Sequence, residues 1–252
     1  MILDCTLRDG GYINNWHFKE RDIGGIINSL VAANIDIVEL GYLSHNKSIG
    51  STYSKDIDAL ATHIEKEFLD TQTKFVVMCN YGELDIKKLP VKSAKSKVWG
   101  IRLAFHRKDW PEAVSQAKEI KALGYQVFIQ PMVTANYSDM ELLSLLTEVN
   151  KLAPYAFYLV DSFGNMEASS LNRLALLVDH NLSADILMGF HSHNNMQLSL
   201  SNAMAFINML SERELIVDSS LMGMGRGAGN LPTEVLVDSL KHKEPHYQLL
   251  EL

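Results

Sequence analysis

The 252-residue sequence has few cysteines, no long apolar run and no excess of basic residues, and each scarcity narrows the possible functions. Only Cys5 and Cys79 are present, both in apolar runs of strand type, which favours reduced core thiols over a disulfide or a zinc site. No apolar stretch approaches the roughly 18 residues that span a bilayer. Asp4 interrupts any apolar leader at the N-terminus, so we expect no signal peptide.

Acidic residues outnumber basic ones, with 30 Asp and Glu against 23 Lys and Arg, and the net charge is −7. Binding to nucleic acid requires a basic patch or stripe, so nucleic acid is not an expected partner. The hydrophobic share of 47% and the charged share of 21% are ordinary for a globular protein with one large core. We therefore expect a cytoplasmic, enzyme-sized domain with no membrane partner.

Short apolar runs that favour strands alternate with segments of helical periodicity along the whole chain. The apolar runs predict strands near 1–5, 35–40, 74–79, 98–104, 125–131, 155–160, 186–191 and 215–221. Helices are predicted near 20–33, 55–68, 111–123, 138–152, 167–180, 196–210 and 232–241. Most of the strand runs are continuously apolar, which is typical of parallel sheets that are buried on both faces.

Eight strand–helix units in about 250 residues match the size of an α/β protein of the (β/α)8 TIM-barrel class. The open doubly wound sheet is the alternative, because periodicity does not distinguish a closed sheet from an open one. We expect a single catalytic barrel domain over residues 1–241 and a C-terminal tail over residues 242–252. In such a barrel the active site lies on the loops that follow the carboxyl ends of the strands.

Several polar residues lie at those strand ends. His191 and His193 are two apart, so both imidazoles face the same side of their strand and suit a divalent metal. Closure of the barrel brings Asp9, after the first strand, across the mouth to them, with Asn230 nearby. Mixed nitrogen and oxygen ligands without a thiolate suit Mn²⁺ or Mg²⁺ best, with Zn²⁺, Co²⁺ or Fe²⁺ as alternatives.

The glycine run from Gly223 to Gly229 has two interpretations. It could be the phosphate loop of a dinucleotide-binding fold, but it follows the last strand rather than the first and lacks the downstream acidic residue. The pattern therefore favours a flexible loop whose backbone approaches a ligand.

Three motifs, in this order and context, resemble the DRE-TIM metallolyase superfamily, the HMG-CoA lyase-like enzymes. They are Thr6-Leu7-Arg8-Asp9-Gly10, His191-Ser192-His193-Asn194 and the run from Gly223 to Glu234. The resemblance spans the barrel from the first strand to the last helix and is closest to the 4-hydroxy-2-oxovalerate aldolase branch. It implies that Asp9, His191 and His193 are metal ligands. In the lyase branch, the residue at the position of Asn230 also reaches the metal.

The resemblance also implies an activity. The protein would be a class II aldolase, a divalent-metal-dependent lyase that cleaves or forms a carbon–carbon bond of a 4-hydroxy-2-oxo acid through a pyruvate-type enolate. Its partners would be a small 2-oxo acid and an aldehyde, and a homo-oligomer is possible. Arg8 would stabilise the enolate oxygen, and Glu39 fills the acidic position of the family on the second strand. Ser162, next to Asp161, would hold the substrate carboxylate.

Tyr12 stands where the related aldolases have a histidine as their base. A phenol has a pKa near 10, so it is a poor base at pH 7 unless the metal or Arg8 lowers that pKa. The base is therefore one of Tyr12, His106, His45 or a metal-bound water.

The sequence also departs from the family in length, because the aldolases that pass their aldehyde to a dehydrogenase carry an extra C-terminal helical domain. We therefore expect neither a channelling dehydrogenase partner nor leucine-type feedback control. The sequence does not identify the substrate. One alternative function is a Claisen-type synthase, similar to isopropylmalate synthase, that joins an acyl-CoA to a 2-oxo acid. Another is a catalytically inactive barrel that acts as a binding module. Tyr12 supports the inactive barrel, whereas the retained Arg8, Asp9 and histidine pair argue against it.

Overall fold

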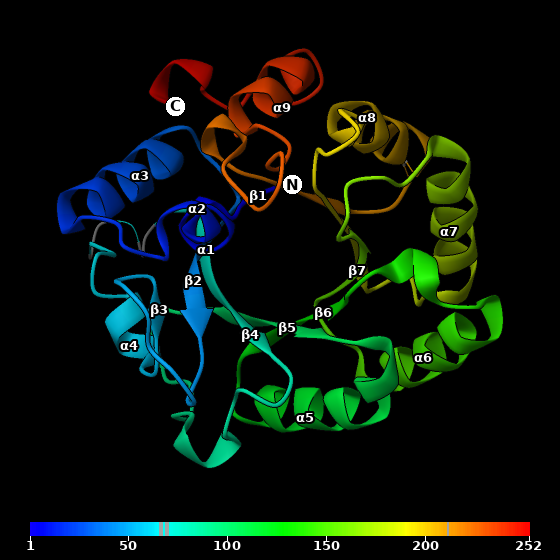
Figure 1. The fold of residues 1–252 in the computed structure, drawn as a ribbon, viewed down its shortest axis with the longest axis horizontal. Helices are drawn as coiled ribbons and strands as arrows, with labels where there is room; N and C mark the ends of the chain where they lie inside the picture. Colours follow the sequence, from blue (N-terminus) through cyan, green and yellow to red (C-terminus); the bar gives the residue numbers. More distant parts are fainter. Residues whose placement is uncertain (66–67, 69–70, 211) are drawn as a thin grey trace.

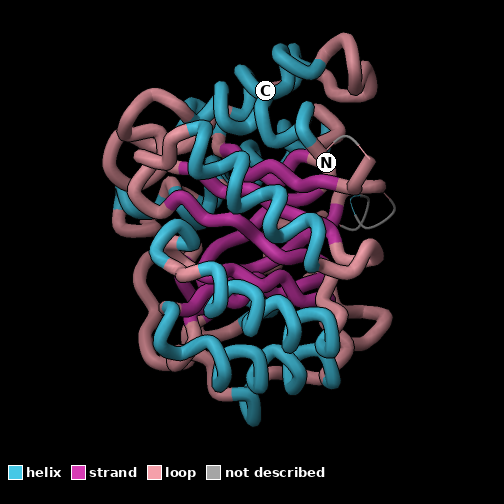
Figure 2. Tube along the Cα trace, turned by 90° about the vertical axis from the view of Figure 1, so that its right-hand side faces the viewer, coloured by secondary structure: helices cyan, strands magenta, loops and turns pink. Residues whose placement is uncertain are grey.

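The computed structural model describes residues 1–65, 68, 71–210 and 212–252, and Figures 1 and 2 show a ring of strands inside a layer of helices. The eight barrel strands are β1 (Ile2–Asp4), β2 (Ile37–Leu43), β4 (Lys74–Asn80), β5 (Gly100–Phe105), β6 (Gln126–Pro131), β7 (Ala156–Asp161), β8 (Leu187–Ser192) and β9 (Leu215–Ser219). They pair in parallel in this order, and β1 pairs with both β9 and β2. The sheet is therefore closed, which confirms the predicted TIM barrel and excludes the open sheet.

The helices lie outside the barrel because each has one apolar face against the strands. The longer ones are α3 (Glu20–Ala32), α5 (Trp110–Ala122), α6 (Asp139–Leu152), α7 (Ala168–Asn181), α8 (Ser199–Met209) and α9 (Thr233–Leu240). The shorter helices are α1 (Thr6–Asp9), α2 (Gly11–Asn14) and α4 (Ile57–Leu60). The short strand β3 (Tyr53–Ser54) pairs with the carboxyl end of β2. The 3-10 turns are η2 (Ile86–Lys88), η3 (Arg107–Asp109), η4 (Thr134–Asn136), η5 (Leu221–Gly223) and η6 (Leu249–Glu251). A capping box at Ser138 and Glu141 fixes the start of α6.

The helix predicted over 55–68 is much shorter in the structure. α4 ends at Leu60, and residues 61–65 are not helical; part of the remainder lies outside the described residues. The Lys97 ammonium donates to the carbonyl oxygens of Ala61, at 3.4 Å, and Ile64, at 2.6 Å. The Ala61 carbonyl oxygen also accepts from the Ile64 N–H at 3.2 Å, in a turn that does not continue as an α-helix. The Lys97 ammonium therefore satisfies carbonyl groups at the point where the helix is not continued.

Apolar side chains fill the barrel and the layer between strands and helices. Leu3, Val76, Phe128 and Tyr158 are buried in the interior cluster. Toward the carboxyl ends of the strands the interior becomes polar and charged, which is where the sequence places its chemistry.

Residues 242–252 cross the end of the barrel beside α3 and the start of β2. The Gln248 N–H donates to the Ala33 carbonyl oxygen at 3.0 Å, and the buried Tyr247 hydroxyl donates to Asp36. These contacts anchor the C-terminal segment to the barrel. The division into a barrel domain that ends at residue 241 and a separate tail stays a prediction. Within the described residues, no helix is long and apolar enough to cross a bilayer.

Candidate active site

The sequence Thr6-Leu7-Arg8-Asp9 forms one helical turn directly after β1, rather than an irregular loop. The Thr6 N–H donates to the Asp4 carboxylate at 2.8 Å, and the Asp9 N–H donates to the Cys5 carbonyl oxygen at 2.8 Å. All four residues of this turn are buried. The turn therefore fixes the side chains of Arg8 and Asp9 at the carboxyl end of the barrel.

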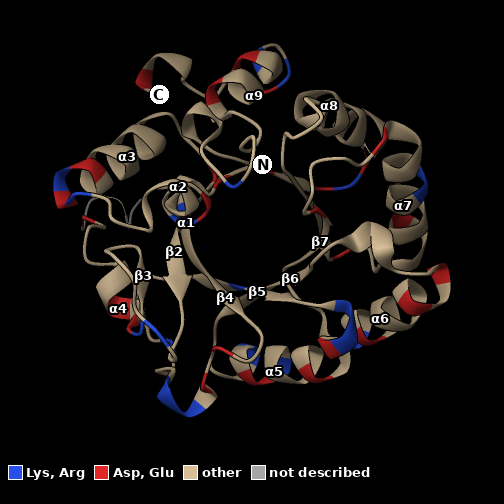
Figure 3. Ribbon diagram, viewed as in Figure 1, with Lys and Arg blue, Asp and Glu red and all other residues tan. Residues whose placement is uncertain are grey.

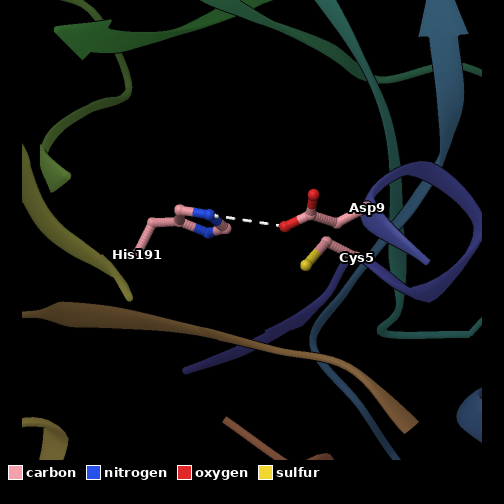
Figure 4. Close-up of side chains that lie close together, drawn as sticks. All are labelled: Cys5, Asp9 and His191. Atoms are coloured by element: carbon pink, nitrogen blue, oxygen red, sulfur yellow. Dashed lines mark ion pairs between the residues drawn. The ribbon is translucent and has the colours of Figure 1, made fainter. Parts of the chain in front are cut away.

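The structure brings Asp9, His191 and His193 together from opposite ends of the chain, as predicted. The Oδ2 atom of Asp9 lies 3.5 Å from Nε2 of His191 and 3.9 Å from Nε2 of His193. Figure 4 shows Asp9 on α1 and His191 on β8 pointing toward each other, with the Cys5 thiol beside them. Three nitrogen and oxygen donors thus converge on one small space.

His191 is held in a single tautomer. Its Nδ1 lies 2.9 Å from Oδ2 of Asp218 on β9, and a carboxylate can only accept, so Nδ1 carries the proton. In the neutral imidazole the lone pair is then on Nε2, the nitrogen nearer to Asp9. A histidine whose other nitrogen donates to a carboxylate is the usual arrangement of a metal-ligating imidazole.

The charge states of the cluster also fit a cation. Burial, and after it the neighbouring His191, lower the pKa of His193 to about 4, so this imidazole is neutral at pH 7. Burial acts to raise the pKa of Asp9, but Arg8 and the two histidines outweigh it and hold that pKa at about 2. The cluster therefore offers a carboxylate and a neutral imidazole lone pair.

Asn230, the fourth predicted ligand, contacts the same carboxylate. Its Nδ2 donates to Asp9 Oδ2 at 2.7 Å, and its buried Oδ1 has no hydrogen-bond partner among the described residues, nor has Nδ1 of His193. Buried polar atoms are rarely left unpaired, so these two atoms suit contact with an ion or a water. Cys5 lies within the same cluster, but burial raises its thiol pKa well above the usual value, which keeps it protonated. The donor set thus fits a divalent metal bound by nitrogen and oxygen.

The unfolding free energy of the metal-free protein should fall as the pH drops from about 6.5 to about 4. In this range unfolded His193 takes up a proton that the folded residue resists, so acid favours unfolding by on the order of 3 kcal/mol. Urea unfolding at several pH values measures the slope. His193→Gln should lose this part of the slope, and an unchanged slope in the variant would contradict the assignment.

Six charged or titratable side chains form a closed ring around the mouth. Arg8 contacts Asp9 at 3.0 Å and Glu39 at 2.7 Å. Arg102 on β5 contacts Glu39 at 2.9 Å and also pairs with Asp218. Asp218 and His191 then return the ring to Asp9. Three carboxylates against two guanidinium groups leave the buried ring one negative charge when the His191 imidazole is not counted, which favours a bound cation.

A cavity of about 80 Å³ lies over this ring. Since one water needs about 10–15 Å³ on a comparable measure, the space suits a ligand of only a few non-hydrogen atoms beside an ion. Its lining residues are Arg8, Asp9, Tyr12, Tyr42, Met78, Asn80, Ala104, Gln130, Met132, Val160, Ser162, His191, His193 and Arg226.

Glu39 and Asn230 do not line this cavity but contact Arg8 and Asp9, which do, whereas three other predicted site residues lie away from it. His106 is exposed after β5, and His45 accepts a hydrogen bond from the Asp85 N–H, at 2.9 Å, in a separate hollow. Asp161 is buried, and its carboxylate accepts from the N–H groups of Asn165 and Met166, so it shapes the loop after β7. The geometry gives these residues no contact with a ligand in the cavity.

The sequence places Tyr42, Arg102, Gln130 and Arg226 at predicted strand ends but assigns them no role or partner, and it does not single out Asp218. In the amide orientation that satisfies its neighbours, Gln130 accepts from Arg102 Nη2 at 2.9 Å. A charged residue directly after apolar strand residues is the signal that could have identified Arg102, after Ile101, and Asp218, after Val217.

Comparison with known proteins agrees with this arrangement. The HMGL-like family model matches residues 1–250. Oxaloacetate decarboxylase of Mycobacterium tuberculosis is 24% identical over 96% of this chain and 70% of its own, and 4-hydroxy-2-oxovalerate aldolase 2 of Mycobacterium ulcerans is 26% identical over 94% and 67%. The N-terminal domain of a candidate aldolase from Bacteroides vulgatus superposes with a TM-score of 0.80 at 29% identity, covering 98% of this chain and 81% of that one.

The Bacillus subtilis HMG-CoA lyase shares the fold, with a TM-score of 0.81 at 14% identity over 100% of this chain and 89% of that one. The resemblance identified from the three sequence motifs is thus confirmed: the chain belongs to the HMGL-like family.

Proposed function

We propose that this protein is a carbon–carbon lyase, a class II aldolase that acts on a 4-hydroxy-2-oxo acid through a pyruvate-type enolate. The observation that carries the proposal is the convergence of Asp9, His191 and His193 beside Arg8 under a small cavity. The relatives named as a 4-hydroxy-2-oxovalerate aldolase and an oxaloacetate decarboxylase support it, since both substrates are 2-oxo acids.

Asp9, His191 and His193 would hold a divalent ion, with Asn230 adjacent through its free Oδ1. When bound, Mn²⁺ or Mg²⁺ supplies a Lewis acid that polarises the carbonyl of the oxo acid. A divalent requirement is typical of HMGL-like aldolases.

The residues of this chain supply charge stabilisation and orientation. Arg8 is held by Asp9 and Glu39, so its guanidinium is fixed where negative charge develops on the enolate oxygen. The Ser162 hydroxyl accepts from the Val133 N–H at 3.0 Å, which leaves its own O–H to donate to a substrate carboxylate. In cleavage, the C4 hydroxyl loses a proton, the C3–C4 bond breaks and its electrons pass to the enolate, which is then protonated at C3.

Exchange of the pyruvate methyl protons with deuterium, followed by proton NMR, tests the function directly. Exchange that requires Mn²⁺ or Mg²⁺ is the expected result, followed by product formation when an aldehyde is added. Release of free CoA from acetyl-CoA and an oxo acid would instead favour the Claisen-type synthase. Pyruvate binding without exchange would favour an inactive barrel.

Tyr12 is the proposed proton carrier, because it lines the cavity, whereas His45 and His106 do not. Its hydroxyl lies 3.2 Å from that of Tyr42. Tyr12→Phe should lower turnover by about 10²-fold, a common contribution of general acid–base catalysis. His45→Ala and His106→Ala should retain activity and serve as controls. Full turnover in Tyr12→Phe would leave a metal-bound water as the base.

A further inference from the structure

Arg226 lies over the mouth of the cavity, in the glycine-rich loop that follows β9. Its Nη2 donates to the Ser162 carbonyl oxygen at 2.9 Å, and its guanidinium carbon lies 6.0 Å from the centre of the Tyr12 ring. One contact comes from the loop after β7 and the other from α2. The side chain is therefore placed over the site from two sides, although it is exposed to solvent.

The loop that carries Arg226 is itself anchored. Asn195 accepts from the Ala228 N–H at 2.7 Å, and the Gly229 N–H donates to the Arg226 carbonyl oxygen at 3.1 Å. At Gly227, φ is +66°, and a Cβ there would lie 2.7 Å from Asn195 Oδ1, so this approach needs glycine. The glycine run therefore forms an anchored loop that holds Arg226 in place, and not the flexible loop that the sequence favours.

Arg226 lacks the carboxylate partner that the other two arginines of the site have. Arg8 and Arg102 each contact two carboxylates, whereas none lies within 4.0 Å of Arg226 in residues 1–65, 68, 71–210 and 212–252. Figure 3 shows charged residues mainly on the outer helices, with a few on the ribbon around the centre of the barrel. A guanidinium offers five N–H donors and one is used here, so it is available for an anion.

Under the proposed function, the enolate end of the substrate lies deeper in the cavity than Arg226. That end belongs beside Arg8 and Asp9, which are 5% and 0% exposed at the floor of the cavity, whereas Tyr12, under Arg226, is 42% exposed. The aldehyde-derived end must therefore extend outward past Tyr12 toward Arg226.

We infer that Arg226 is a specificity-determining residue that binds a second anionic group, a carboxylate or a phosphate, on the aldehyde half of the substrate. This inference rests on the proposed function. Arginine forms paired, charge-assisted hydrogen bonds with both groups, and Tyr12 and Ser162 hold its guanidinium ready to do so.

Matched aldehyde pairs test the inference in the aldol direction with pyruvate and Mn²⁺. Succinic semialdehyde is compared with butanal, and glyceraldehyde 3-phosphate with glyceraldehyde, so the pairs also separate carboxylate from phosphate. The wild type should have a kcat/KM about tenfold to hundredfold higher for the anionic member of at least one pair. Arg226→Gln should remove this preference, Arg226→Lys should keep part of it, and Arg173→Gln on the outer helix α7 should leave it unchanged.

Exchange of the pyruvate methyl protons, measured in the same variants, distinguishes a failure of the proposed function from a failure of the role inferred for Arg226. Normal exchange in Arg226→Gln together with a lost anion preference supports the inference. Exchange in the wild type with no preference for either anionic aldehyde overturns it and leaves the proposed function standing. Equal losses in exchange and in all aldehyde reactions would place Arg226 at the oxo-acid end, which also overturns it. Absence of exchange in the wild type overturns the proposed function itself, and the inference with it.

Discussion

Asp9→Asn should abolish tight binding of Mn²⁺ and lower turnover by about 10³-fold or more. Asparagine keeps the shape and can still contact Asn230, but it removes the only carboxylate that faces both His191 and His193 in the described cluster. The two imidazoles alone are a weak site for a hard cation that prefers oxygen ligands. Titration calorimetry with Mn²⁺ and exchange of the pyruvate methyl protons measure the two losses.

The control for this variant is Asp58→Asn, which removes one exposed carboxylate from α4 and should change neither quantity. Asp9→Asn also frees Arg8 from one of its two ionic contacts, so a thermal melt should accompany the binding data. Mn²⁺ binding within about threefold of the wild type, in a folded Asp9→Asn protein, would show that Asp9 is not a ligand.

The sequence predicts the positions of Asp9, His191 and His193 because hydrophobic runs show where strands end. In a closed parallel barrel all carboxyl ends lie at one side, so polar residues just past those ends must gather there. The same rule places His106 and Asp161 near the mouth, but it does not fix the direction of a side chain on a loop. His106 lies at the start of a 3-10 turn and is exposed, and Asp161 is used by its own loop.

Partners inside the barrel are beyond what local pattern predicts. Arg102 lies in β5 and Asp218 in β9, on opposite parts of the sheet, and the strand residues that precede each of them are uncharged. Which inward-facing residues meet across the interior depends on the stagger of all eight strands, which is a property of the closed sheet. The ring that holds Arg8 and His191 in place is therefore visible only in three dimensions.

Arg102→Met should cost about 3–5 kcal/mol of unfolding free energy at pH 7, the expected cost of breaking a buried ion pair. Arg102 is fully buried between Glu39 and Asp218, and its guanidinium lies 4.8 Å from the centre of the Tyr158 ring. Methionine fills much of the space, but it leaves Glu39 with Arg8 as its remaining ionic partner and Asp218 with only the His191 imidazole. Urea unfolding of the metal-free protein measures the loss, and weaker His191 orientation should also lower Mn²⁺ affinity by about 10- to 100-fold.

The pH dependence of the Arg102→Met deficit distinguishes lost charge from lost packing. Burial favours a raised pKa for Asp218, but Arg102 outweighs it and lowers that pKa in the wild type. Without Arg102 the folded-state pKa of Asp218 rises, so folding takes up protons and the variant loses stability as pH increases. The deficit should therefore be larger at pH 8 than at pH 5, and adding Glu39→Gln and Asp218→Asn should recover part of it. Arg107→Met, on the exposed turn after β5, should change stability by less than about 0.5 kcal/mol. A deficit that is the same at both pH values would assign the role of Arg102 to packing instead of charge.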